Sequence, residues 1–389
     1  MKKLWLAAVL LLLMLLVFTG CSGPAEEEPQ DQSPAVEDPA EEGEAAEEGL
    51  KIAIVTSPSG VDDGSFNEDN YNGILNFIEK HPSASVTPIN ETTGDVAAAV
   101  QAVADVVADY DVIVTPGFQF AGISEIAVNN PEKKFILVDS DPAPVGDQTV
   151  FDNIYAMTFA EEESGFFAGI TAALESANGK VAVVNGIAFP SNVNYQWGFE
   201  SGVNYANKHY ESSAEVVELP SYAGTDVTGA DVGGNYVGNF ADPATGKVVA
   251  NALLAEDVDT VFVAAGFSGM GVFTAAMEAG DTNIIGCDVD QFDDGQYADG
   301  NVILTSVLKN MAINVERQLV AIEEGTFKGG NETLRADTDS TGYVSLEGRQ
   351  QLGEETLEIL KEVYDLVKDG QIIPSANFNG YTPEDFPGL

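Results

Sequence analysis

From residue 50 onward, short apolar runs alternate with segments of helical periodicity. The first run, 52–55, is followed by a turn rich in Gly, Asp and Ser and then by a helical pattern, so it forms a strand–loop–helix unit. Such alternation is typical of a doubly wound parallel α/β sheet. The pattern predicts further strands near 111–115, 135–139, 153–158, 181–185 and 260–265, and helices near 67–80, 95–109, 124–129, 164–176, 194–210, 271–279 and 354–368.

These units fall into two series of similar length, which predicts two lobes instead of one continuous sheet, and 389 residues suit two domains of ordinary size. We place lobe 1 at 50–155 plus about 290–335, and lobe 2 at 156–289 plus about 336–389. The stretch 220–239 is rich in Gly, Asp and Thr without a clear period, and we expect a long surface loop there. Ligands of open α/β sheets bind outside the carboxyl ends of the strands, so we look for the site there.

The N-terminus resembles a lipoprotein signal. Lys2 and Lys3 precede an apolar run, 4–18, which is short for a membrane span and normal for a secretory signal. Small residues then precede Cys21, which predicts a signal peptide over 1–21 and a lipid on Cys21. Phe18 stands where such signals usually have Leu, which leaves an uncleaved anchor as the alternative; both arrangements put the domain outside the cytoplasm, at the cell membrane. Cys287 is the other cysteine, and we expect a buried thiol without a disulfide.

Residues 22–49 are rich in Glu, Pro, Ala and Gly, which predicts a disordered acidic tether. The whole chain carries a net charge of −47, and without the leader lysines and 22–50 it still has 14 basic and 52 acidic residues, a net charge of −38. This charge argues against nucleic acid and anionic lipid surfaces as partners. Adaptation to high salt and electrostatic steering of a neutral or cationic ligand are both consistent with it.

The turn after the first strand contains the most distinctive stretch of the chain. Ser65 followed by Glu68 predicts a capping box that starts the helix and directs Phe66 and Asn67 out of the loop. The simpler interpretation is that the acidic and hydroxyl residues over 62–65 only form turns and caps.

The stretch resembles the signature of the basic membrane protein family of substrate-binding lipoproteins, which are purine-nucleoside receptors of ABC importers. Val55-Thr56 and the run 62–67, Asp-Asp-Gly-Ser-Phe-Asn, match that signature, whereas Ser57 replaces the usual Asp. Further matches follow in order over nearly all of 51–375, at 162–169, 198–202, 240–247, 266–271, 288–291 and 304–309. The resemblance implies a two-lobed type I periplasmic-binding-protein fold with the ligand cleft between the lobes.

Two aromatic residues are candidates for stacking on a purine. The resemblance points to Phe66 and to Tyr195, one from each lobe, although Trp197 is close enough in sequence to compete with Tyr195. An aromatic face stacked on a base contributes about 1 to 3 kcal/mol. The alternative is that these are ordinary core aromatics.

Charged residues at strand ends are candidates for the ribose. Asp139 and Asp288 each end a predicted strand, and carboxylates accept strong hydrogen bonds from vicinal hydroxyls. The resemblance adds Lys309 to them, with a snorkelling surface lysine as the alternative. Ser57 is expected near the base, where its hydroxyl is a weaker partner than the family's Asp, and Gly266 either lets the backbone approach the ligand or forms a turn.

Other chemistry finds little support. The acidic residues over 288–299 miss the spacing of an EF-hand loop, the glycines over 266–271 miss the dinucleotide fingerprint, and neither histidine lies in a nucleophile motif. The resemblance therefore implies a monomeric, lipid-anchored nucleoside receptor without a cofactor, which docks on ABC permease subunits. A receptor for another ligand such as a sugar, and a lipid-anchored hydrolase or nucleosidase, remain as alternatives.

Overall fold

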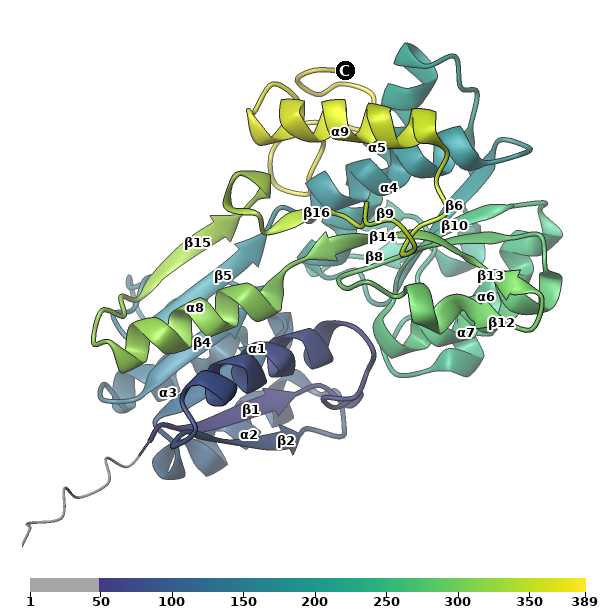
Figure 1. The fold of residues 1–389 in the computed structure, drawn as a ribbon. Coiled ribbons are helices and arrows are strands. Elements are labelled where there is room, and N and C mark those ends of the chain that lie inside the picture. Colours follow the sequence, from purple (N-terminus) through teal and green to yellow (C-terminus); the bar gives the residue numbers. More distant parts are fainter. Residues whose placement is uncertain (1–48) are drawn as a thin grey trace, which may run out of the picture. The chain divides into compact units, whose positions relative to one another are not determined.

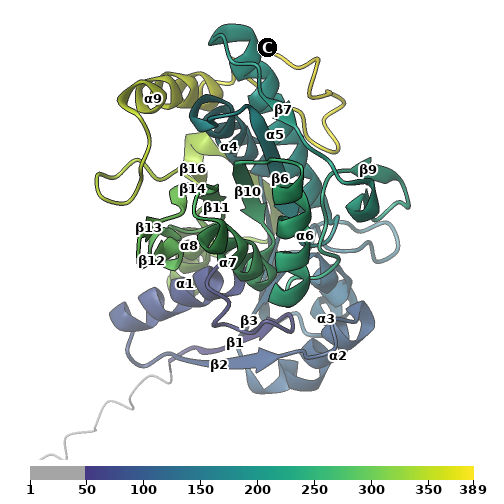
Figure 2. The same cartoon turned by 90° about the vertical axis from the view of Figure 1, so that its right-hand side faces the viewer.

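The computed structural model describes residues 49–389, so the predicted signal peptide, Cys21 and the tether lie outside the described residues. Two six-stranded sheets organise this part of the chain (Figures 1 and 2). The first sheet is parallel throughout, in the order β15 (Gly330–Leu334), β5 (Ile154–Phe159), β4 (Lys134–Val138), β3 (Val112–Pro116), β1 (Lys51–Thr56) and β2 (Ser85–Asn90).

The second sheet has the order β16 (Thr341–Tyr343), β14 (Ile303–Lys309), β11 (Asn283–Gly286), β10 (Thr260–Ala264), β6 (Lys180–Asn185) and β7 (Glu215–Val216). It is parallel except for the β14–β16 pair. Of the range 290–335, which we expected in lobe 1, β14 therefore pairs in the second sheet and β15 in the first.

Helices cover both faces of each sheet, because the buried strands are apolar on both sides. On the first sheet, α1 (Phe66–Lys80) and α8 (Met311–Glu323) pack on one face, and α2 (Val96–Val106) and α3 (Ser124–Asn129) pack on the other. On the second sheet, α4 (Glu161–Glu175), α5 (Pro190–His209) and α9 (Glu354–Lys368) face α6 (Pro243–Ala255) and α7 (Gly269–Ala279) across the strands. The predicted doubly wound α/β class is confirmed.

Three segments connect the two sheets: the β5–α4 junction, the β14–α8 junction and the stretch from β15 to β16. Acidic residues of the first junction hold the other two. Glu161 pairs with Lys309 at 3.0 Å, and Glu163 accepts hydrogen bonds from the Ala336 backbone N–H at 2.9 Å and the Thr341 hydroxyl at 2.6 Å. The three connections are therefore tied to one another beside the carboxyl ends of the strands.

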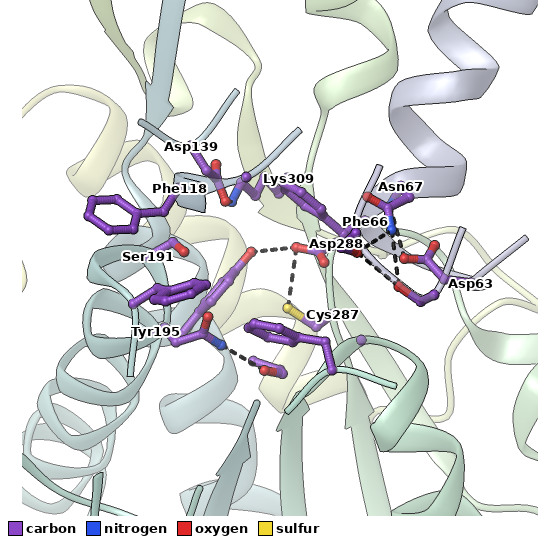
Figure 3. Close-up of a pocket in the computed structure, with 18 of the residues that line it drawn as sticks. Asp63, Phe66, Asn67, Phe118, Asp139, Ser191, Tyr195, Cys287, Asp288 and Lys309 are labelled. Carbon is purple, nitrogen blue, oxygen red and sulfur yellow. Dashed lines mark hydrogen bonds and ion pairs between the residues drawn. The ribbon is translucent and has the colours of Figure 1, made fainter. Parts of the chain in front are cut away.

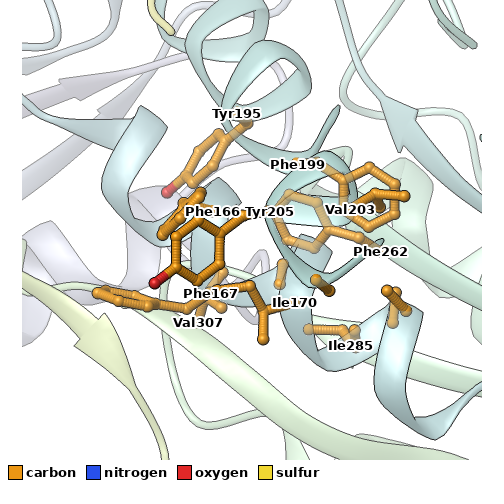
Figure 4. Close-up of a cluster of buried hydrophobic side chains, with 14 of the residues drawn as sticks. Phe166, Phe167, Ile170, Tyr195, Phe199, Val203, Tyr205, Phe262, Ile285 and Val307 are labelled. Carbon is orange, nitrogen blue, oxygen red and sulfur yellow. The ribbon is translucent and has the colours of Figure 1, made fainter. Parts of the chain in front are cut away.

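Close contact between α4 and α5 explains two of the glycine-containing motifs. A Cβ atom at Gly165, Gly169, Gly198 or Gly202 would lie 2.0–2.4 Å from a backbone oxygen of the facing helix, which no side chain tolerates. The two backbones therefore pack directly against each other, beside an aromatic cluster that includes Phe166, Phe199 and Phe262 (Figure 4). This packing fixes the start of α5, which carries Tyr195.

The stretch 220–239 is only in part the long surface loop that we expected, since most of it is exposed or half-buried. It contains a short hairpin, β8 (Gly224–Thr225) with β9 (Asp231–Gly233), and then Asn235 and Tyr236, which are buried. The Asn235 amide donates to the Val183 and Val217 carbonyls at 3.0 Å each. Its side chain therefore satisfies the strand edge, a role that a search for periodicity does not detect.

Candidate ligand-binding site

A cavity lies where the carboxyl ends of the two sheets face each other (Figure 3). All eight ligand residues expected from the sequence line it: Ser57, Phe66, Asn67, Asp139, Tyr195, Gly266, Asp288 and Lys309. They come from segments far apart in the chain, and the topology brings them together. The remaining lining residues are Ser59, Asp63, Gly117, Phe118, Gln119, Phe189, Ser191, Asn192, Phe240, Ala264 and Cys287.

The two strand-end aspartates share an uncommon backbone conformation. Asp139 follows β4 with a φ of 62°, and Asp288 follows β11 with a φ of 68°. Left-handed backbone is unfavourable for residues other than glycine, although Asp and Asn tolerate it best. Each strand therefore ends in a turn that directs a carboxylate into the cavity (Figure 3).

Lys309 is not a surface lysine, because its side chain is only 2 % exposed. Its ammonium forms an ion pair with Asp139 and lies 3.0 Å from Glu161 Oε1. It also lies over the rings of Phe66 at 5.1 Å and Tyr195 at 5.9 Å. Burial disfavours the charged amine, but Asp139 and Glu161 outweigh it and raise the pKa of Lys309, so the lysine stays protonated.

Asp139 keeps one oxygen free for another partner. Its Oδ2 pairs with Lys309, whereas its Oδ1 is buried and accepts no hydrogen bond within residues 49–389. Burial raises the pKa of Asp139, and Lys309 opposes that shift. An acceptor that is buried without a donor is costly, and a ligand hydroxyl would relieve that cost.

Asp288 is fully occupied by neutral donors. Its Oδ1 accepts from the Tyr195 hydroxyl at 2.9 Å and its Oδ2 from the Ser65 hydroxyl at 3.0 Å. Because Ser65 precedes α1 and Asp288 follows β11, the second bond joins the ends of the two sheets. The buried Cys287 thiol, expected from the sequence, also donates to Asp288 at 3.5 Å.

The expected capping box at the start of α1 is wrong. Ser65 makes no side-chain cap, and Glu68 accepts from the Gly64 N–H at 2.9 Å instead of from Ser65. Asp63 caps the helix, since its carboxylate accepts from the backbone N–H groups of Ser65, Asn67 and Glu68 at 3.0–3.1 Å. A carboxylate three residues ahead of the first helical residue, Phe66, displaces the serine from the cap and leaves the Ser65 hydroxyl free to reach Asp288.

Small polar groups line the cavity beside β1. The Asn67 amide donates to the hydroxyls of Ser57 at 3.0 Å and Ser59 at 3.1 Å. Its Oδ1 is buried and accepts no hydrogen bond from residues 49–389. This corner therefore offers two hydroxyls and one free amide acceptor.

Of the two aromatic residues on α5 that the sequence offered for stacking, Tyr195 reaches the cavity and Trp197 does not. Trp197, the competitor of Tyr195, packs beside Ala188, Val193 and Tyr236 and does not line the cavity. Tyr195 does line it, but its ring packs edge-on against Phe262 and its hydroxyl is used by Asp288.

Three phenylalanines that we did not expect form a row along the cavity. The ring centroids of Phe118 and Phe189 lie 5.4 Å apart, and those of Phe189 and Phe240 lie 6.0 Å apart. Two signals were available: Phe118 follows the β3 strand end, and Phe240 opens one of the motifs quoted above. Glu161, the second partner of Lys309, was also missed, because no local pattern indicates it.

The comparisons with known proteins agree with this architecture. The family model described as ABC transporter substrate-binding protein PnrA-like matches residues 50–366. The chain is 28% identical to the ABC transporter nucleoside-binding protein BmpA of Lactococcus lactis, over 84% of this chain and 89% of that protein. It is 27% identical to basic membrane protein A of Borreliella burgdorferi, over 83% of this chain and 81% of that protein.

Solved structures show the same fold. A solute-binding protein of an ABC transporter system from Aeropyrum pernix superposes with a TM-score of 0.71 at 22% identity, covering 85% of this chain and 94% of that one. One from Conexibacter woesei gives a TM-score of 0.60 at 20% identity, covering 84% and 99%. These neighbours support the two-lobed type I arrangement.

Proposed function

We infer the function of this protein from its family, because the chain belongs to the PnrA-like family of ABC transporter substrate-binding proteins. The protein is thus the substrate-binding component of such a transporter. We propose that its ligand is a purine nucleoside, bound at the cavity between the carboxyl ends of the two sheets. The nucleoside-binding relative in Lactococcus lactis supports this choice.

The observation that carries the proposal is the pairing of aromatic rings with one unsatisfied carboxylate oxygen. Phe66, Phe189 and Phe240 offer flat apolar faces for a base, whereas Asp139 Oδ1 and the Lys309 ammonium offer an acceptor and a donor for ribose hydroxyls. Free pentoses would leave the rings unused, and free bases would leave Asp139 unsatisfied. A nucleoside uses both ends of the cavity.

The charge of the lining favours an uncharged ligand. Asp63, Asp139 and Asp288 line the cavity with a single basic residue, Lys309, which is already paired. A phosphate group would meet these carboxylates without a free cation, so we expect nucleotides to be excluded. The cavity residues include neither histidine, and Cys287 is a buried thiol whose pKa burial raises, so we propose binding without a chemical reaction.

We further propose that the ligand enters between separated lobes and that the lobes then close around it by bending at the three connections. The lobes would have the bounds expected from the sequence, except that β14 belongs to the sheet of lobe 2. Residues 49–389 contain no helix that is long and apolar enough to cross a bilayer. We propose that a lipid on Cys21 holds a monomeric receptor on the extracytoplasmic face, where the closed form meets the permease subunits.

The test is thermal unfolding of the purified protein with nucleosides, free bases, pentoses and nucleotides. A ligand at a hundredfold excess over its dissociation constant stabilises the folded state by about 2.7 kcal/mol. We expect adenosine, guanosine or inosine to raise the melting temperature, and ribose and nucleotides to leave it unchanged.

The Phe66→Ala variant separates a nucleoside site from a sugar site. Loss of the stacking face weakens nucleoside binding by about 1 to 3 kcal/mol and leaves a sugar's hydrogen bonds in place. Phe378→Ala, at a side chain that is 69% exposed, is the matched control. A folded protein that no nucleoside stabilises would refute the proposal.

A further inference from the structure

A second cavity of about 400 Å³ adjoins the candidate site. The loop between β2 and α2 lines one side with Glu91, Thr92 and Thr93, and Ile187, Asn239 and Ala241 line the other. The two cavities share five side chains: Ser57, Ser59, Gln119, Phe189 and Phe240. The two cavities therefore adjoin at these residues.

The shared residues are the part of the first cavity's lining that borders the second cavity. Asp139 and Lys309, which the proposed function assigns to the ribose, line the first cavity and not the second. With the sugar beside Asp139 and Lys309, the base extends toward Ser57, Ser59 and the two shared phenylalanines. In a purine nucleoside the six-membered ring lies farthest from the sugar, so its outer edge faces the second cavity.

The lining of the second cavity selects for an uncharged group. Glu91 is the one charged residue that lines it. Its Oε1 accepts from the Thr93 N–H at 2.7 Å and the Thr93 hydroxyl at 2.6 Å, and its Oε2 accepts from the Gly94 N–H at 2.8 Å. The carboxylate is thus satisfied by the protein, and hydroxyl and apolar side chains make up most of the remaining wall.

We propose that this second cavity is a subsite for an uncharged substituent on the base, so that the ligands include purine nucleosides with an alkyl or aryl group on the 6-amino nitrogen. The inference rests on the proposed function. The side chains that line both cavities include two small serines, whose hydroxyls lie 3.1 Å apart, and two aromatic rings that suit an apolar group.

Calorimetric titration with adenosine and N6-benzyladenosine tests the subsite. We expect the unmodified protein to bind both, with dissociation constants within about tenfold of each other. Thr92→Trp, at an exposed residue that lines only the second cavity, should weaken N6-benzyladenosine by at least about tenfold and change adenosine binding by less than about threefold. Ala241→Trp fills the opposite wall from another exposed position and should act in the same way.

Val128→Trp is the matched control, because Val128 is 45% exposed on α3 and lines neither cavity. If adenosine binds and N6-benzyladenosine does not, the subsite is refuted while the proposed function stands. If each tryptophan variant weakens adenosine and N6-benzyladenosine to the same extent, the subsite is also refuted. If neither nucleoside binds to the folded protein, the proposed function fails and the subsite fails with it.

Discussion

Asp139 and Asp288 occupy equivalent places in the two sheets, yet their partners differ. Both follow a central parallel strand, both adopt left-handed backbone and both reach the same cavity. Asp139 faces a buried lysine and keeps one oxygen without a partner, whereas Asp288 is surrounded by hydroxyl donors and keeps none. The same backbone geometry thus leaves a free buried acceptor on one side and forms an internal hydrogen-bond centre on the other.

The difference assigns separate work to the two halves of the site. On the Asp139 side the partners are charged, and Lys309 also pairs with Glu161 at a connection between the sheets. We therefore propose that this half links ligand contact to that connection. On the Asp288 side the bond from Ser65 joins the two sheet ends directly. We therefore expect the first half to determine which ligand binds and the second to stabilise the enclosed arrangement.

The strongest test of the charged half is Lys309→Met. This change leaves Asp139 and Glu161 buried without a counter-charge, and breaking a buried pair costs about 3 to 5 kcal/mol of folding free energy. Denaturant unfolding at pH 7 measures the loss. Lys247→Met, which breaks the exposed pair with Glu278, is the control and should cost less than about 1 kcal/mol. If the two variants have equal unfolding free energies, the buried ion pair contributes no more to stability than the pair at the surface.

Asp139→Asn and Asp288→Asn compare the halves directly. Asp139→Asn keeps the shape but removes the charged acceptor, so nucleoside affinity should fall by about 1.5 to 3 kcal/mol while binding of the free base stays nearly unchanged. Asp288→Asn disturbs the hydroxyl centre and should weaken nucleoside and free base together. Titration with inosine and hypoxanthine separates the two patterns. A matching loss of free-base binding in Asp139→Asn would contradict the division of work.

Ser65→Ala tests the bond between the sheet ends. Without the hydroxyl, Asp288 Oδ2 loses the donor from the opposite sheet, and ligand affinity should fall by about tenfold, or about 1.4 kcal/mol. Most of the change should appear in the dissociation rate, because the bond is made in the enclosed arrangement. Stopped-flow displacement gives that rate, with the exposed Ser213→Ala as the control. A variant with unchanged dissociation would remove the structural role given to Asp288.

Much of this architecture was predictable from local pattern. Apolar runs placed β1, β3, β4, β5, β6 and β10, because strands buried on both faces must be apolar, but not β11 and β14. The ends of apolar runs also led to Asp139 and Asp288. The partners of these residues were not predictable in the same way. Glu161 lies on a helix with no distinguishing period, and Asp63 outcompetes Ser65 for the helix cap through contacts that depend on the folded turn. The row from Phe118 to Phe240 exists only after three distant loops meet.

Glu162 lies next to Glu161 in the sequence but does not pair with Lys309. The pH dependence of stability therefore compares a buried carboxyl without a lysine partner with Asp139, which has one. Burial raises the pKa of Glu162 to about 8, and the negative charges of Glu161 and Glu163 add to the shift, while Arg335 at 3.6 Å opposes it. The folded protein therefore holds a proton that the unfolded chain releases near pH 4.5, so this residue lowers stability progressively as pH rises from about 4.5 to 8.

Glu162→Gln removes that loss. The variant should match the unmodified protein near pH 4.5 and exceed its unfolding free energy at pH 8.5 by at least about 1.4 kcal/mol, the equivalent of one pKa unit. Exposed Glu358→Gln is the control and should leave the pH profile unchanged. Burial also raises the pKa of Asp63 and Asp69 to about 6, that of Asp139 to about 7 and that of Glu200 to about 8. These four carboxyls are present in all three proteins, so their effects cancel in the difference between the denaturation curves. Parallel curves for Glu162→Gln and the unmodified protein would mean that Arg335 neutralises Glu162 as fully as Lys309 neutralises Asp139.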